Sequence, residues 1–268
     1  MFVLILFLLL FLIYFILYLY EQLHYVTIYI GLFLSLFVIF FLYILRNPTE
    51  LLIPYNILIE NLYEKKVFYS EEEKKKIFPT STVLEENFSK IKEECLNTLK
   101  STDPSELENV GKNFIIPEDK EFFTNWNTYP LRMFGRDYED NMNKCPTLKK
   151  ILQSDTNITT AFFSIMEPGK FLSSHYGPFK GILRYHLGLQ VPPQNSGLCY
   201  ISVDGQTYDW KEGEGILFDE TYKHFVKNST PYRRIVLFLD VKRPLSFPIS
   251  FVNDFILFLM SISPYNFH

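Results

Sequence analysis

The sequence predicts a mainly-β protein whose core is a double-stranded β-helix, or jelly roll, preceded by helices and by a transmembrane helical hairpin. Three observations predict this fold class. The first 45 residues are almost free of charge, residues 82–100 have the apolar spacing of an amphipathic helix, and short β-rich runs follow from about residue 159. Beyond the apolar N-terminus roughly 220 residues remain, enough for one well-packed domain.

Two uncharged segments, residues 2–20 and 25–45, form the predicted hairpin. Each is long enough to cross a hydrocarbon core of about 30 Å as a helix, and only a short polar segment separates them. A cleaved signal peptide is the alternative. It is less favoured because the apolar stretch is too long and lacks a basic start and a small-residue cleavage site. We therefore expect an uncleaved anchor over residues 1–45 and an integral membrane protein.

The charges that flank the hairpin predict the side on which the rest of the chain lies. Arg46 follows the second apolar segment directly and Lys65 and Lys66 come soon after, whereas the loop after the first segment has no Lys or Arg. Positive charge concentrates on the cytoplasmic side of membrane proteins. The sequence therefore favours a cytoplasmic position for the main domain.

The remaining chain divides into three predicted parts. Residues 46–80 are expected to be a linker and a charged helix, in which the run 71–76 (EEEKKK) forms a solvated face. The main domain is expected over residues 81–244. Residues 245–268 form an apolar C-terminal segment that contains Asp254, which is costly to bury in lipid. We expect this segment to be packed or interfacial, and so able to associate with the membrane, rather than a third span.

Composition excludes two classes of function. The formal net charge is −4 and the chain has no strongly basic block, so nucleic-acid binding is not expected. The three cysteines, Cys95, Cys145 and Cys199, are odd in number and widely spaced. This pattern favours free thiols over a disulfide framework or a zinc site.

The β-rich region predicts a barrel of the jelly-roll, cupin-like type. Gly, Pro, Asp or Asn separate most of its short runs, which is typical of all-β sandwiches and barrels. The runs are TTAFFSIM, ILRYHLGLQV, GLCYISV, QTYDW, GILFD, HFVKN and RRIVLFLDV.

Three histidines lie in this region: His175 in FLSSHYGP, His186 in LRYHLGL and His224 in ETYKHFVKN. Jelly-roll oxygenases commonly hold non-haem Fe(II) with two histidines and a carboxylate, one histidine and the carboxylate being two residues apart. Here the residue two positions after His175 is Gly177. The residues alone leave two interpretations open, an iron site without its carboxylate or histidines with structural roles.

Longer segments indicate the function. Residues 162–192 and 210–244 contain, in order, HxGP, LRxHLGLxxP, WxxGxxxxFD, a downstream histidine and RxxxxxDVxxP. This ordered set resembles the aspartyl/asparaginyl β-hydroxylase family, which includes peptide hydroxylases and bacterial lipid A hydroxylases. Residues 79–136 also resemble the N-terminal part of that family. The resemblance implies a dioxygenase that uses Fe(II), the co-substrate 2-oxoglutarate and O₂.

The resemblance also implies an iron site. His175 and His224 match the family's two iron ligands, and they are the candidate catalytic and metal-binding residues. Gly177 matches the position at which peptide hydroxylases of this family carry glycine and water completes the coordination shell. The missing carboxylate is therefore compatible with iron binding.

Four further residues match the family's contacts to 2-oxoglutarate. Arg234, with Ser164, is expected to hold the distal carboxylate, and Arg184 with His186 the end that chelates iron. An arginine can bind a carboxylate bidentately, as a dicarboxylate co-substrate requires. Arg184 and His186 are two residues apart on a predicted strand, so their side chains share one face.

One departure bears on the substrate. Peptide hydroxylases of the family carry a further arginine, associated with an acidic substrate side chain, at the position of Ile182. The chain also has no tetratricopeptide-type repeats ahead of the main domain. With the apolar termini, these features favour a lipid or another membrane-proximal substrate. The alternatives are a peptidyl aspartyl/asparaginyl β-hydroxylase and a non-catalytic, membrane-anchored jelly-roll binding protein.

Overall fold

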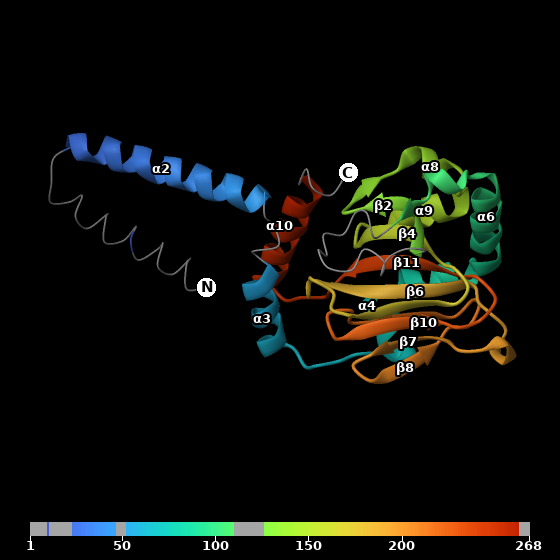
Figure 1. The fold of residues 1–268 in the computed structure, drawn as a ribbon. Helices are drawn as coiled ribbons and strands as arrows, with labels where there is room; N and C mark the ends of the chain where they lie inside the picture. The colour runs from blue at the N-terminus through green and yellow to red at the C-terminus, as the bar shows by residue number, and fades with distance from the viewer. Residues whose placement is uncertain (1–9, 11–22, 47–51, 110–125, 263–268) are drawn as a thin grey trace.

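The computed structural model describes residues 10, 23–46, 52–109 and 126–262, which form a mainly-β barrel with helices on its outside (Figure 1). Within these residues, one antiparallel sheet has the order β1-β2-β4-β11-β6-β9, with β3 paired to β2, and a second has the order β5-β10-β7-β8. The predicted mainly-β fold of antiparallel sheets is confirmed. The strands are β1 (Glu108–Asn109), β2 (Trp126–Met133), β3 (Arg136–Asp137), β4 (Ile158–Met166), β5 (Lys170–His175), β6 (Ile182–Gln190), β7 (Cys199–Val203), β8 (Gln206–Asp209), β9 (Gly215–Phe218), β10 (His224–Asn228) and β11 (Arg234–Lys242).

Strand alternation separates two apolar cores. In β4 and β6 the side chains of Phe163, Ile165 and Leu187 point outward and join the buried core beneath the helices. The alternate residues point into the barrel, whose apolar interior contains Leu172, Ile201, Trp210, Phe218 and Val226. Because successive side chains alternate between faces, polar residues such as Ser164 are brought into the barrel interior.

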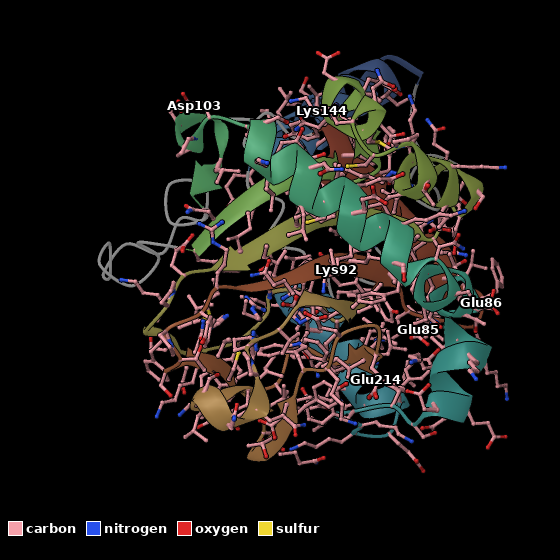
Figure 2. All side chains as sticks on the ribbon, turned by 90° about the vertical axis from the view of Figure 1, so that its right-hand side faces the viewer. Glu85, Glu86, Lys92, Asp103, Lys144 and Glu214 are labelled. Carbon is pink, nitrogen blue, oxygen red and sulfur yellow. The ribbon has the colours of Figure 1, made fainter. Side chains whose placement is uncertain are left out.

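Helices cover the outer face of the larger sheet. Figure 2 shows α6 lying across that sheet, and buried Ile91 and Cys95 of this helix pack onto the outward side chains of the strands. The predicted amphipathic helix thus appears as α5 and α6, which meet at Asn87. The helices of this layer are α4 (Glu71–Ile77), α5 (Thr80–Glu86), α6 (Phe88–Ser101), α8 (Glu139–Asn143) and α9 (Pro146–Ser154), and the 3₁₀ turns are η2 (Pro104–Glu106) and η3 (Gln194–Ser196).

The run predicted to be a solvated helical face is solvated only in part. It forms α4, which begins with a capping box between Ser70 and Glu73. However, the Lys74 side chain is buried: its ammonium pairs with Glu85 at 2.7 Å and donates to the Gly215 carbonyl oxygen at 2.7 Å. A buried ammonium needs such partners, and here they attach α4 to α5 and β9. Charge pattern alone could not show that one lysine turns inward.

The predicted transmembrane hairpin is not supported. Its first segment, residues 2–20, lies outside the described residues except for residue 10. The second forms α2 (Leu23–Arg46). Among the helices that the structure describes, none has the length and apolarity required of a membrane span.

Two further helices lie beside one end of the barrel. These are α3 (Leu52–Leu62) and α10 (Ile249–Ile262), the latter from the predicted apolar C-terminal segment. Ile59 of α3 and Ile256 of α10 pack together with Phe179 and Ile182 of the barrel in a third apolar cluster. Figure 1 shows α2, α3 and α10 on the same side of the molecule.

Candidate active site

A cavity of about 30 Å³ inside the barrel is lined by every residue that the sequence analysis assigned to iron or co-substrate binding. The side chains come from both sheets, so closure of the barrel brings together residues that are far apart along the chain. Besides these residues the lining contains Trp126 and an apolar wall. The lining is Trp126, Ser164, Leu172, His175, Arg184, His186, Ile201, Phe218, His224, Val226, Arg234 and Phe238.

His175 and His224 lie opposite each other on neighbouring strands. His175 ends β5 and His224 begins β10, where the two residues pair across the ladder, and their ring centroids are 4.1 Å apart. Their Nδ1 atoms lie 2.8 Å from the Ser173 carbonyl oxygen and 2.9 Å from the Tyr222 carbonyl oxygen, respectively. A carbonyl only accepts, so each Nδ1 carries the proton and each Nε2 keeps its lone pair in the neutral ring.

Burial keeps both rings neutral. It lowers the pKa of His175, and it lowers the pKa of His224 to about 3 with a further contribution from the neighbouring His175. Two neutral imidazoles with oriented Nε2 atoms suit a transition metal such as iron. Among the described residues no group of three or more His, Cys, Asp or Glu side chains is arranged around a metal position. Within the described residues, the candidate iron ligands remain the two histidines named from the sequence.

Arg234 is a buried cation that has no acidic partner in the part of the chain that the structure describes. Only 2% of the residue is exposed, its guanidinium lies 4.7 Å from the centre of the Trp210 ring, and it donates to Ser164 Oγ at 3.3 Å. Within the described residues its Nε has no hydrogen-bond partner, and no carboxylate contributes to its electrostatics. Burial lowers the pKa of Arg234 to about 10, so the side chain stays charged at neutral pH.

His186 offers two further unused polar atoms. Its ring is enclosed by Phe218 and Phe238, each with its centroid 5.1 Å away, and burial lowers its pKa well below the usual value. In the part of the chain that the structure describes, neither ring nitrogen has a hydrogen-bond partner. Buried polar atoms are normally paired, so these positions indicate a ligand or solvent in the cavity.

Arg184 has partners that the sequence did not predict. Its guanidinium is bound by Glu220 and, at 3.0 Å, by Asp240, and it lies over the Phe238 ring. The predicted role of Arg184, binding the chelating end of 2-oxoglutarate, would therefore have to be shared with two carboxylates. The signal for them was indirect: Asp240 stands in the quoted RxxxxxDV segment and Glu220 four residues before His224.

The space beside Gly177 is filled by Glu220. A Cβ atom on Gly177 would collide with the Glu220 carboxylate, and the Gly177 amide donates to the Glu220 backbone oxygen at 2.9 Å. Glycine is therefore required here for close packing. The family resemblance implied that water occupies the space beside Gly177. In the structure the buried carboxylate of Glu220 lies there.

The cavity is electrically polarised. Near the histidines, one guanidinium faces the two carboxylates of Glu220 and Asp240, which leaves excess negative charge when both are ionised. Burial raises the pKa of Glu220, to about 7, and that of Asp240, since desolvation outweighs the attraction of Arg184. Arg234, at the start of β11, is a positive charge with no carboxylate beside it among the described residues. This arrangement favours a cation near the histidines and an anion near Arg234.

Comparison with known proteins identifies the family. The family model described as "Aspartyl/Asparaginyl beta-hydroxylase" matches residues 85–244, more than half of the chain. The chain belongs to the aspartyl/asparaginyl β-hydroxylase family. This is a family of hydroxylases, as the resemblance in the sequence implied.

Relatives in this family act on different substrates, according to their names. The chain is 44% identical over 142 residues, 53% of its length, to the ornithine lipid ester-linked acyl 2-hydroxylase of Rhizobium tropici, and covers 50% of that protein. It is 28% identical over 168 residues, 60% of its length, to human aspartyl/asparaginyl β-hydroxylase, and covers 21% of that protein. The chain thus spans half or less of these relatives. A solved prolyl-4-hydroxylase from Pseudomonas putida is more distant, with 15% identity, a TM-score of 0.37 and coverage of 59% of this chain and 88% of that one.

Ile182, the residue that bears on the substrate in the sequence, does not line the cavity. It is buried against α3 and α10. Ile182 is the first residue of β6 and shares a strand face with Arg184. This edge of the barrel meets the two helices. The substitution therefore replaces a potential cation at this position with part of an apolar contact.

Proposed function

We propose that the protein is an Fe(II)- and 2-oxoglutarate-dependent dioxygenase that hydroxylates an unactivated C–H bond of a membrane-proximal substrate, an acyl chain of a lipid. The observation that carries this proposal is the buried guanidinium of Arg234, which has no acidic partner among the described residues and lines a cavity together with two oriented histidines. Burying a charge without a partner costs several kcal/mol, about as much as is lost when a buried pair is broken. A dicarboxylate ligand would remove that cost.

The residues fit the two groups at opposite ends of the cavity. His175 and His224 would bind Fe(II) through Nε2, and the charge of Fe(II) would offset the excess negative charge around Glu220. Arg234 and Ser164 would hold the distal carboxylate, and His186 would hydrogen-bond 2-oxoglutarate nearer the iron. When bound, iron, 2-oxoglutarate and O₂ supply the oxidising chemistry. The chain would orient them, and the apolar part of the cavity lining would exclude water.

Binding requires side chains to move. A cavity of about 30 Å³ holds one or two water molecules, whereas 2-oxoglutarate has five carbons and two carboxylates. Trp126 is only partly buried and its Nε1 donates to Ser164 Oγ at 2.9 Å. The distal carboxylate of 2-oxoglutarate would bind at Ser164 and would compete with the indole of Trp126 for the space beside it. Trp126 is therefore the lining residue that we expect to shift.

Two observations support a lipid substrate. The relative that is 44% identical is named for hydroxylation of a lipid acyl chain, and Ile182 occupies the position associated with an acidic peptide substrate. We also propose that the protein is membrane-associated with its catalytic domain on the cytoplasmic side, because positive charge follows the second apolar segment. A peptidyl aspartyl/asparaginyl hydroxylase is the second candidate, supported by the name of the human relative.

A product analysis distinguishes these substrates. We expect the purified full chain, given Fe(II) and 2-oxoglutarate, to add one oxygen atom to the acyl chain of ornithine lipids or phospholipids, detected by mass spectrometry. Acidic peptides containing Asp or Asn serve as the competing substrate in the same reaction. Hydroxylation of the peptides alone would replace the lipid assignment with the peptide one.

A further inference from the structure

The helices beside the barrel expose an extended apolar surface. Here the α3–α10 face means the outward apolar side chains of these two helices and the residue just before α10. Phe247 is 83% exposed and Phe251 is 68% exposed, values that are unusual for large aromatic side chains. The other members are Ile53, Ile57, Leu58, Leu62, Val252, Phe255, Phe258 and Ile262.

The adjoining helix α2 indicates what covers this face. α2 contacts α10, and between Tyr29 and Tyr43 most of its apolar side chains are exposed, with values from 38% at Phe33 to 63% at Leu36. No charged residue lies between those two tyrosines. A groove on a partner protein covers one side of a helix, whereas lipid can surround it. Exposed apolar side chains on several sides of α2 therefore fit the acyl region at a bilayer surface better than a single groove on a protein.

The opposite side of the α3–α10 face is attached to the loop that follows His175. Asn56 of α3 donates through Nδ2 to the Pro178 carbonyl oxygen at 2.7 Å, and its Oδ1 accepts from the Lys180 amide at 2.8 Å. One side chain thus holds the loop on both sides of Phe179. Residues 176–181 connect His175 at the end of β5 to β6.

A second, buried set of hydrogen bonds attaches α10 to the same loop. Asn253 is 2% exposed; its Oδ1 accepts from the Tyr55 hydroxyl at 2.8 Å and its Nδ2 donates to the Gly181 carbonyl oxygen at 3.1 Å. A Cβ atom on Gly181 would collide with Asn253 and Phe179, so the loop and the helix are in close contact. Movement of the helices relative to the barrel would therefore disturb the loop beside His175.

We propose that the α3–α10 face, continuous with α2, lies in the surface of a lipid bilayer and fixes the position of the His175 loop relative to the membrane. Docking of this face rests on the proposed function only in that the substrate is taken to be a lipid. Docking places the catalytic cavity at a set distance from the acyl chains on which it acts. Because the contact is apolar, it does not require anionic lipid or low salt.

Depth-dependent fluorescence quenching tests the docking. The full chain is reconstituted into phosphatidylcholine vesicles with brominated acyl chains, and a thiol-reactive fluorophore is attached to Phe258→Cys or, as a second position, Phe255→Cys. Leu198→Cys is the matched control, because Leu198 and Phe258 are both 55% exposed and Leu198 lies before β7, away from α10. Cys95, Cys145 and Cys199 are buried and burial raises their pKa, so the introduced thiol reacts first.

We expect quenching at positions 258 and 255 to exceed that at position 198 several-fold and to persist in 1 M NaCl. Equal quenching at all positions, no quenching at α10, or disulfide cross-links between two copies through position 258 would overturn the proposal. Succinate formation in the same vesicles separates this test from that of the proposed function. Turnover without quenching at α10 refutes docking alone, and quenching without turnover on any substrate refutes the proposed reaction alone.

Discussion

Arg234→Met should weaken 2-oxoglutarate binding by about 100-fold, because breaking a buried charged pair costs a few kcal/mol and each factor of ten corresponds to about 1.4 kcal/mol. The dissociation constant is measured by calorimetry without O₂, with Mn(II) in place of Fe(II). Methionine has a comparable length and no charge, so it limits the cavity that alanine would leave.

The same variant separates ligand binding from a structural role. In the ligand-free protein Arg234 is buried with no acidic partner among the described residues, so Arg234→Met should leave the free energy of unfolding unchanged or raise it. Arg233→Met is the matched control: Arg233 is next in the chain, is exposed and pairs with Glu167. An unchanged affinity for 2-oxoglutarate together with a lower unfolding free energy would make Arg234 a structural residue.

His175→Ala should abolish stoichiometric binding of Fe(II) or Mn(II), and His224→Ala should do the same. The expected effect is large because these two imidazoles are the only candidate ligands that the described residues bring together, so each variant leaves a single ligand. Calorimetry or the Mn(II) electron paramagnetic resonance signal measures the loss.

Tyr176→Ala is the control for the metal measurement, since Tyr176 follows His175 but is 66% exposed. Its metal affinity should match that of the unmodified chain. Circular dichroism establishes that the histidine variants remain folded. Full metal retention in both histidine variants would show that the pair does not form the metal site.

Local pattern predicted the strands and the residues that meet in the candidate site. Period-two alternation placed Arg184 and His186 on one face, and both line the cavity. The ordered motifs identified His175 and His224 as candidate iron ligands, and in the structure these two residues pair across neighbouring strands. These features depend on neighbours in the sequence or on a family resemblance, so the amino-acid sequence was sufficient to predict them.

Contacts between distant segments were not predictable in the same way. Glu220 meets Gly177 and Arg184 only after the barrel closes, and the sequence suggested an open position instead. Lys74 is buried because it pairs with Glu85 and donates a hydrogen bond to a carbonyl of β9, although its neighbours in the sequence are charged and exposed. Ile182 faces α10, which follows it by more than sixty residues. In each case a partner remote in the chain decides the environment.

The central claim is that the two histidines and Arg234 hold Fe(II) and 2-oxoglutarate in one site that drives hydroxylation. Its most direct test is the amount of succinate that the purified full chain forms in the presence of lipid substrate. We predict that succinate forms only when Fe(II), 2-oxoglutarate and O₂ are all present, in proportion to hydroxylated product, and that His175→Ala and Arg234→Met nearly eliminate it at low 2-oxoglutarate. Hydroxylated product that forms without consumption of 2-oxoglutarate, or equal succinate from the variants, would contradict the claim.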